Sequence, residues 1–140
     1  MNIIIAAILA TPFLAGGATQ ETEAKDVVKE FRSIYFLKTT SDEERIVAIQ
    51  RLARTPNKIT AKMLGKLLLI APDAHRMEAA TAFGSFSRVR GASVYVAKAL
   101  ISRSNSKKTD LRVALVRTLG SLRQITILPI LHRLVEKDDV

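Results

Sequence analysis

The side chains that most often carry chemistry are few in this chain. It has two histidines, His75 and His132, and each is followed by arginine, so neither belongs to an H-E-x-x-H zinc motif. His132 and Glu136 share an expected helix face, but two ligands do not make a zinc site. We expect both histidines to be exposed or to lie between helices. The sequence contains no cysteine, no G-x-S-x-G motif and no phosphate-binding loop. It therefore predicts a protein that is not an enzyme and uses no metal or cofactor; the alternative is an enzyme whose site has no recognisable motif.

Positive charge is the remaining chemical feature. Lysine and arginine number 22 against 13 acidic residues, which gives a net charge of +9 and favours acidic partners. Five of the cations fall in the expected turns between paired helices: Arg54, Lys58, Arg88, Arg90 and Arg123. They either interact with the C-terminal ends of helices or form one basic edge that binds an anionic partner. No aromatic residue lies between them to stack on bases, which argues against nucleic acid.

A segment that recurs three times must position these residues. Its copies are Asp42–Arg54, Asp73–Phe86 and Asp110–Leu122. In each copy an arginine follows an aspartate by two or three positions, and the pairs are Asp42 with Arg45, Asp73 with Arg76, and Asp110 with Arg112. The arginines are spaced by 31 and then 36 residues. A repeat of this period predicts stacked helical units, which bury a continuous core only as a stack of about three or more.

Apolar periodicity predicts helices and no strand. The expected ranges are Ala24–Leu37, Ser41–Arg54, Ile59–Ile70, His75–Phe86, Ala92–Ser102, Thr109 or Asp110 to about Gly120, and about Thr126–Lys137. Ser41 and Glu44 form a capping box at the start of the second range. Asp73 is expected to cap a later helix, and either Thr109 or Asp110 another.

The third copy reads T-D-L-R-V-A-L-V-R-T-L-G-S-L followed by I-L-P-I-L-H-R-L-V-E-K-D-D-V, and it resembles HEAT repeats in the short form common in bacterial proteins. Leu115 departs from the family pattern, which prefers alanine there. The resemblance covers about residues 41–140. It implies an all-α, right-handed α-solenoid of about three helix pairs, at about 41–72, 73–108 and 109–140, after a lead and capping helix at 19–40. It also implies that the recurring Arg and Asp residues stabilise the stack and do not bind a ligand.

A repeat of this kind indicates binding along a stacked surface. The function that we predict is a non-catalytic scaffold for protein–protein interaction with an unidentified partner. The alternative is a basic solenoid that binds an anionic polymer or nucleic acid, because some HEAT-like DNA glycosylases use basic concave faces.

The N-terminal stretch has the layout of a secretory signal peptide. Ile3–Ala10 is an unbroken apolar run, Pro12 ends it, and Gly16 and Ala18 supply the small residues for a cut after Ala18. No Lys or Arg precedes the run. Residues 1–18 therefore predict export to the periplasm or the outside, where nucleic acid is scarce; the alternative is a first buried helix in a cytoplasmic protein. The run is shorter than the ~20 residues of a stable membrane span. Thr19–Glu23 is expected to be a flexible lead.

The last predicted helix has a wide apolar face. Its six apolar residues cover an arc of roughly 160°, more than one packed neighbour needs: Ile127, Leu128, Ile130, Leu131, Leu134 and Val135. Pro129 fits only if it lies in the first turn. We expect self-association or a docked partner at this helix, with Ile130 or Leu134 near the contact.

Overall fold

The computed structural model describes residues 16–138, without the side chains of residues 134, 137 and 138. Within this range the protein is all-helical and has no strand, which confirms the predicted class. The α-helices are α2 (Gly16–Tyr35), α3 (Asp42–Ala53), α4 (Lys58–Ile70), α5 (Asp73–Ala82), α6 (Ala92–Ile101), α7 (Thr109–Leu122) and α8 (Leu128–Asp138). Three short 3₁₀-helices, η1 (Phe83–Phe86), η2 (Arg103–Asn105) and η3 (Ile125–Ile127), follow α5, α6 and α7. Most of the predicted signal peptide lies outside the described residues.

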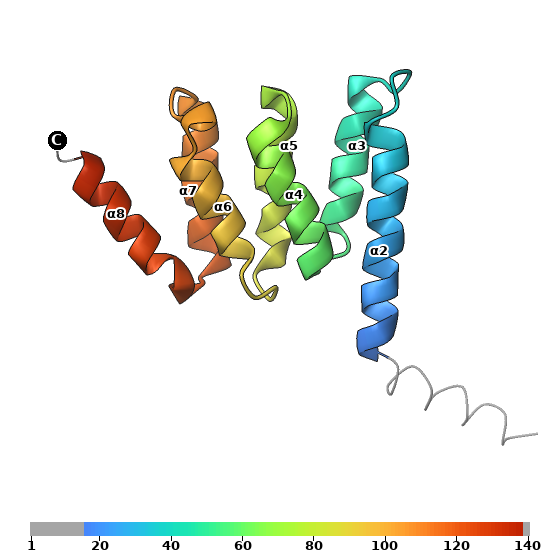
Figure 1. Cartoon of the computed structure of the whole chain (residues 1–140), viewed down its shortest axis with the longest axis horizontal. Helices are drawn as coiled ribbons and strands as arrows, with labels where there is room; N and C mark the ends of the chain where they lie inside the picture. The colour runs from blue at the N-terminus through green and yellow to red at the C-terminus, as the bar shows by residue number, and fades with distance from the viewer. Residues whose placement is uncertain (1–15, 139–140) are drawn as a thin grey trace, which may run out of the picture.

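The helices stand side by side in a row of two layers (Figure 1). One layer contains α3, α5 and α7, each packed on the next, and the other contains α2, α4 and α6 in the same order. The closest pairs across the layers are α2–α3, α4–α5 and α6–α7. One apolar cluster runs between the layers, with Phe31, Leu64 and Phe83 among its buried members. At the end of the row, α8 packs on α6 and η3.

Two helices begin with the side-chain caps that short polar residues provide. The capping box predicted at α3 is confirmed: the Ser41 amide donates to Glu44 at 2.8 Å, and the Glu44 amide donates to the Ser41 hydroxyl at 3.2 Å. Asn57 and Thr60 form a second box at the start of α4. Both boxes satisfy amides that a helix leaves without partners in its first turn.

The caps predicted for α5 and α7 are wrong. The residues that precede these helices are Pro72 and Lys108, and neither helix has a side-chain cap. Asp73 is already the first helical residue of α5, as Thr109 is of α7 with Asp110 next to it. A residue inside the first turn cannot fold its side chain back onto the following amides as a cap does.

The first helix is longer than the sequence predicts. α2 begins at Gly16, not at Ala24, and includes Thr19–Glu23, which was expected to be a flexible lead. Two local contacts stabilise this added part: the Thr22 hydroxyl donates to the Ala18 carbonyl at 2.9 Å, and Glu21 pairs with Lys25 one turn later at 2.6 Å. The cut predicted after Ala18 therefore falls within the first turn of α2.

The C-terminal boundaries agree more closely. α7 continues to Leu122, slightly beyond the predicted end near Gly120, and Arg123 then adopts the left-handed conformation at φ 51°. Pro129 is the second residue of α8, inside its first turn as predicted. No helix in the part of the chain that the structure describes is long and apolar enough to cross a membrane.

Candidate functional site

The three recurring arginines lie at one edge of the α3–α5–α7 layer. Each donates to a backbone carbonyl at or next to the C-terminal end of the helix that precedes its own: Arg45 to Tyr35 at 3.1 Å, Arg76 to Ala71 at 2.6 Å, and Arg112 to Leu100 at 3.1 Å. The carbonyls in the last turn of a helix have no partner within that helix. The arginines supply those partners, and we call these three residues with their contacts the anchor edge.

Arg76 belongs to a larger buried network at this edge. Its guanidinium also donates to the Asn105 side chain and to the Ser104 hydroxyl, at 3.3 Å for the latter. Asn105 is fully buried and donates in turn to the carbonyls of Leu68 at 3.0 Å and Ala99 at 2.9 Å. One asparagine in a segment predicted to be a polar loop therefore joins α4, α5 and α6.

The recurring aspartates have unequal surroundings. Asp42 lies 3.3 Å from Arg45 and 3.6 Å from Nε2 of His75. His75 is buried between helices, and its Nδ1 shares a 2.7 Å hydrogen bond with the Tyr35 hydroxyl, whose pKa is raised by burial. Asp73 pairs with Lys108, and this hydrogen bond lowers the pKa of Asp73. Asp110 is exposed.

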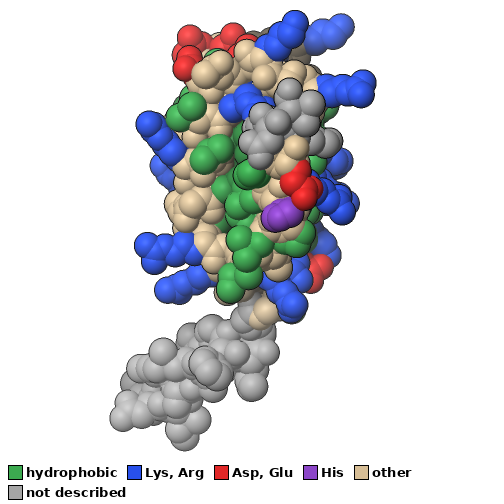
Figure 2. Space-filling view, turned by 90° about the vertical axis from the view of Figure 1, so that its left-hand side faces the viewer, with side chains coloured by type: hydrophobic (Ala, Val, Ile, Leu, Met, Phe, Trp, Pro, Cys, Tyr) green, Lys and Arg blue, Asp and Glu red, His purple; other side chains and the backbone are tan. Residues whose placement is uncertain are grey.

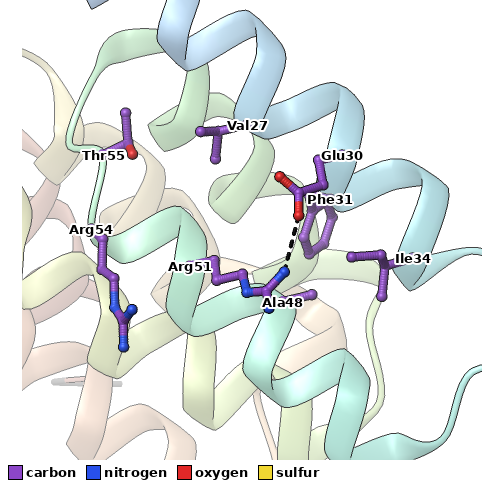
Figure 3. Close-up of a pocket in the computed structure, with 8 residues that line it drawn as sticks. All are labelled: Val27, Glu30, Phe31, Ile34, Ala48, Arg51, Arg54 and Thr55. Atoms are coloured by element: carbon purple, nitrogen blue, oxygen red, sulfur yellow. Dashed lines mark hydrogen bonds and ion pairs between the residues drawn. The ribbon is translucent and has the colours of Figure 1, made fainter.

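The five cations of the predicted basic edge are all exposed. Lys58, Arg88 and Arg90 line a groove of about 530 Å³. Arg54 instead lines a cavity between α2 and α3, where Figure 3 shows Arg51 reaching across to Glu30. Arg123 follows α7, and the side-chain amide of the next residue, Gln124, donates to the carbonyls of Ser87 at 3.3 Å and Val89 at 2.8 Å, in the turn that carries Arg88 and Arg90.

A second groove, of about 460 Å³, runs between α2 and α4 and reaches Tyr95 of α6. Five cations line it, namely Lys25 and Arg32 from α2 and Lys58, Lys62 and Lys66 from α4. Three apolar side chains, Val28, Ile59 and Met63, complete its lining. We call this feature the basic groove.

Helix periodicity places these cations together. Lys58, Lys62 and Lys66 recur every four residues, so they form a row with a spacing of about 6 Å along α4, which has no acidic residue. Only Lys25 has a carboxylate partner among the described residues, because Glu21 pairs with it; their hydrogen bond lowers the pKa of Glu21. Like charges four residues apart destabilise a helix by about 0.2–0.5 kcal/mol per pair. The row therefore lowers the stability of α4, and no ion pair with a described residue offsets this cost.

Gly65 determines how the end of the groove is built. A Cβ atom at this buried position would lie 2.6 Å from Cδ1 of Tyr95, so only glycine lets the ring lie directly on α4. The ring also stacks with Phe83, with centroids 6.5 Å apart and planes 27° apart. Tyr95 is thus held between the core and the groove.

The sequence identified part of this groove. Of the five groove cations, the sequence pattern singled out only Lys58, in a turn between paired helices. The missing signal was the packing of α2 on α4, two helices further along the chain. The one local sign was in α2, where Lys25 and Arg32 are seven residues apart and therefore lie on the same face, beside the apolar stripe.

The structure describes the side chain of one of the two residues predicted near a C-terminal contact. Ile130 is half-buried against the core, and the side chain of Leu134 lies outside the described residues. Leu128 and Val135 are the exposed apolar residues of α8. His132 is exposed, 3.3 Å from Glu136. No group of three or more potential metal ligands occurs among the described residues.

Comparison of the chain with models of known protein families, with curated proteins and with solved structures found no match in any of the three.

Proposed function

We propose that this protein is a non-catalytic scaffold that binds an acidic segment of a partner protein in the basic groove. The observation that carries the proposal is the set of four cations, Arg32, Lys58, Lys62 and Lys66, that line the groove and form no ion pair with any described residue. Cations at a binding surface raise the association rate and select partners of opposite charge. No hydrogen bond or ion pair of these four side chains joins two of the described helices.

The lining of the groove favours a protein over another polyanion. Ile59 supplies partly exposed apolar surface beside the cations, next to the buried Val28 and Met63. An acidic amphipathic segment covers that surface with its own apolar side chains while its carboxylates meet the lysines, which is how helices dock in grooves. A polyphosphate chain leaves the apolar surface in water, and a single-stranded nucleic acid is bound by stacking its bases on aromatic side chains. Tyr95 already stacks with Phe83.

We infer that the two layers are a right-handed α-solenoid of three HEAT-like helix pairs, with α2 as the capping helix. The equivalent contacts of Arg45, Arg76 and Arg112 support this arrangement. We also propose that the protein is exported and loses residues 1–18, on the ground of the apolar run and of the small residues before position 19. The intact mass of the protein from its native host tests the cleavage, and a chain that still begins at Met1 overturns it.

Binding of three labelled probes by the full-length chain tests the proposed function. The first probe is an acidic amphipathic peptide long enough to span α4, the second is the same peptide with serine at its apolar positions, and the third is a single-stranded oligonucleotide. We expect the first to bind about tenfold more tightly than the second, a difference of about 1.4 kcal/mol. Equal binding of both peptides, or stronger binding of the oligonucleotide with a steep loss in salt, favours a polyanion binder and overturns the proposal.

A further inference from the structure

The two ends of the helix row differ in what they expose. At the α7–α8 end, a band of apolar side chains runs down the molecule with Lys and Arg at its edges (Figure 2). Val113 and Val116 of α7 are exposed at this end, and Arg117 follows them. We call these three residues the stacking face.

Equivalent positions explain why this face is apolar. The residues four positions after the anchor arginines are Ile49, Ala80 and Val116. Ile49 and Ala80 are 0% exposed, whereas Val116 is 55% exposed. At Ala80 the covering helix is the next one in its layer, because the Thr118 hydroxyl of α7 donates to the Ala80 carbonyl at 3.0 Å. Val116 thus occupies a position that α3 and α5 bury inside the molecule.

The opposite end carries the complementary positions. Leu115 and Thr118, three and six residues after Arg112, are the side of α7 that is buried toward α5. The same two positions in α3 are Ala48 and Arg51, and among the described residues no helix precedes α3 in its layer.

Two cavities lie at these α3 positions. One, of about 350 Å³, is lined by Ala48, Arg51 and Thr55 together with α2 (Figure 3). A second, of about 460 Å³, is lined in part by Glu43, Glu44 and Val47. Val47 is 46% exposed. We call this end of α3 the receiving face.

We propose that two copies of this chain associate head to tail, with the stacking face of one copy on the receiving face of the next. The contact reuses the positions by which α5 follows α3 and α7 follows α5. Charge agrees with this order, since Arg117 belongs to the stacking face and Glu43 and Glu44 line the receiving face, where Arg51 is already paired with Glu30. Such a contact is heterologous, so each added copy leaves one face of each kind free and the row extends.

The head-to-tail association does not depend on the proposed function, but it affects how the basic groove binds a partner. On α2 the groove residues Lys25 and Arg32 point away from Val27 and Ile34, which line the receiving-face cavities, because these pairs lie roughly 160–200° apart around the helix. Stacking therefore leaves the basic groove of every copy open. A row of identical grooves binds a partner with several acidic segments by avidity.

Sedimentation of the full-length chain over a range of concentrations tests the inference, with Val116→Glu and Val47→Glu as variants. We expect the wild type to form species that grow with concentration, and each variant alone to stay monomeric with an unchanged helical circular dichroism signal. An equimolar mixture is the decisive sample: Val116→Glu keeps an intact receiving face and Val47→Glu an intact stacking face, so the mixture forms dimers and nothing larger.

Three results overturn the inference. A monomeric wild type at every concentration excludes the association. Dimers of Val47→Glu alone indicate a symmetric contact through α7 and α8. A mixture that remains monomeric shows that the two faces do not meet. Val113→Glu, which changes the same stacking face at a second exposed position, is expected to behave as Val116→Glu does.

Discussion

The cations of this protein belong to two regions with opposite surroundings. At the anchor edge, Arg45, Arg76 and Arg112 are partly or wholly buried, and each donates to a carbonyl of the preceding helix. In the basic groove, Lys62 and Lys66 are exposed and have no carboxylate partner in the described part of the chain. The arginines recur with the repeat, whereas α6 has a single lysine, Lys98, where α4 has three.

This difference separates architecture from binding. A cation that recurs in every unit does the same work in each, which is to satisfy carbonyls at a helix end. The lysine row occurs on α4 only, so it does not have a structural role common to all the units. Repulsion between its lysines destabilises α4. The unequal part of the repeat is therefore where we place the function.

The largest effect on stability is expected at Arg76. Replacing it with methionine removes hydrogen bonds to the Ala71 carbonyl and to Asn105 and leaves both polar groups buried, so the free energy of unfolding should fall by about 3 kcal/mol. Urea denaturation measures the change. Lys62→Gln is the matched control in the basic groove and should stay within about 0.5 kcal/mol of wild type. Equal losses in the two variants would remove the distinction between the regions.

Tyr35→Phe should have a smaller effect. It leaves Nδ1 of the buried His75 without its partner, which costs about 1–2 kcal/mol at neutral pH. The pKa of Tyr35 is raised by burial, so its contribution is fully present below the ordinary tyrosine pKa of about 10 and is lost as the pH rises through the raised value. Stability measured from neutral to alkaline pH should therefore fall less steeply in the variant. An identical alkaline dependence in both proteins contradicts this assignment.

Two glycine substitutions should change stability in opposite directions. Gly65→Ala brings a Cβ to 2.6 Å from the Tyr95 ring, and the strain should exceed the gain in helix propensity and lower stability by about 1 kcal/mol. Gly120→Ala, in α7, meets no atom within 4 Å and should raise stability by about 0.5–1 kcal/mol. Thermal unfolding compares the two. A stabilising Gly65→Ala would mean that Tyr95 moves freely at the end of the groove.

Local signals were enough to predict much of the fold. The capping box at Ser41 and the position of Pro129 depend on neighbouring residues, and so the all-α class and most helix boundaries could be predicted. The start of α2 could not be predicted, because the polar composition of Thr19–Glu23 is equally typical of a flexible lead. Asp73 could not be placed either, since its partner Lys108 lies just before α7, two helices further along the chain.

The site was harder to predict than the fold for a related reason. Each wall of the basic groove shows an ordinary exposed face of an amphipathic helix, and Lys25 and Lys62 meet only because α2 packs on α4. Sequence patterns indicate which face of a helix is exposed to solvent, but they do not indicate which exposed faces of different helices lie next to each other. The contact of Gly65 with Tyr95 could not be predicted from the sequence, because a single glycine in a helix has several explanations.

The most direct test compares two variants of equal charge. Lys62→Gln/Lys66→Gln removes two groove cations, and Lys38→Gln/Lys107→Gln removes two exposed cations from loops outside the groove. Both should unfold within about 0.5 kcal/mol of wild type. The affinity of the full-length chain for the acidic amphipathic peptide is then measured by fluorescence anisotropy. If the groove is the binding site, the first variant binds about tenfold more weakly and the second changes by less than about twofold. Equal losses in the two variants would show that net charge, and not the groove between α2 and α4, attracts the peptide.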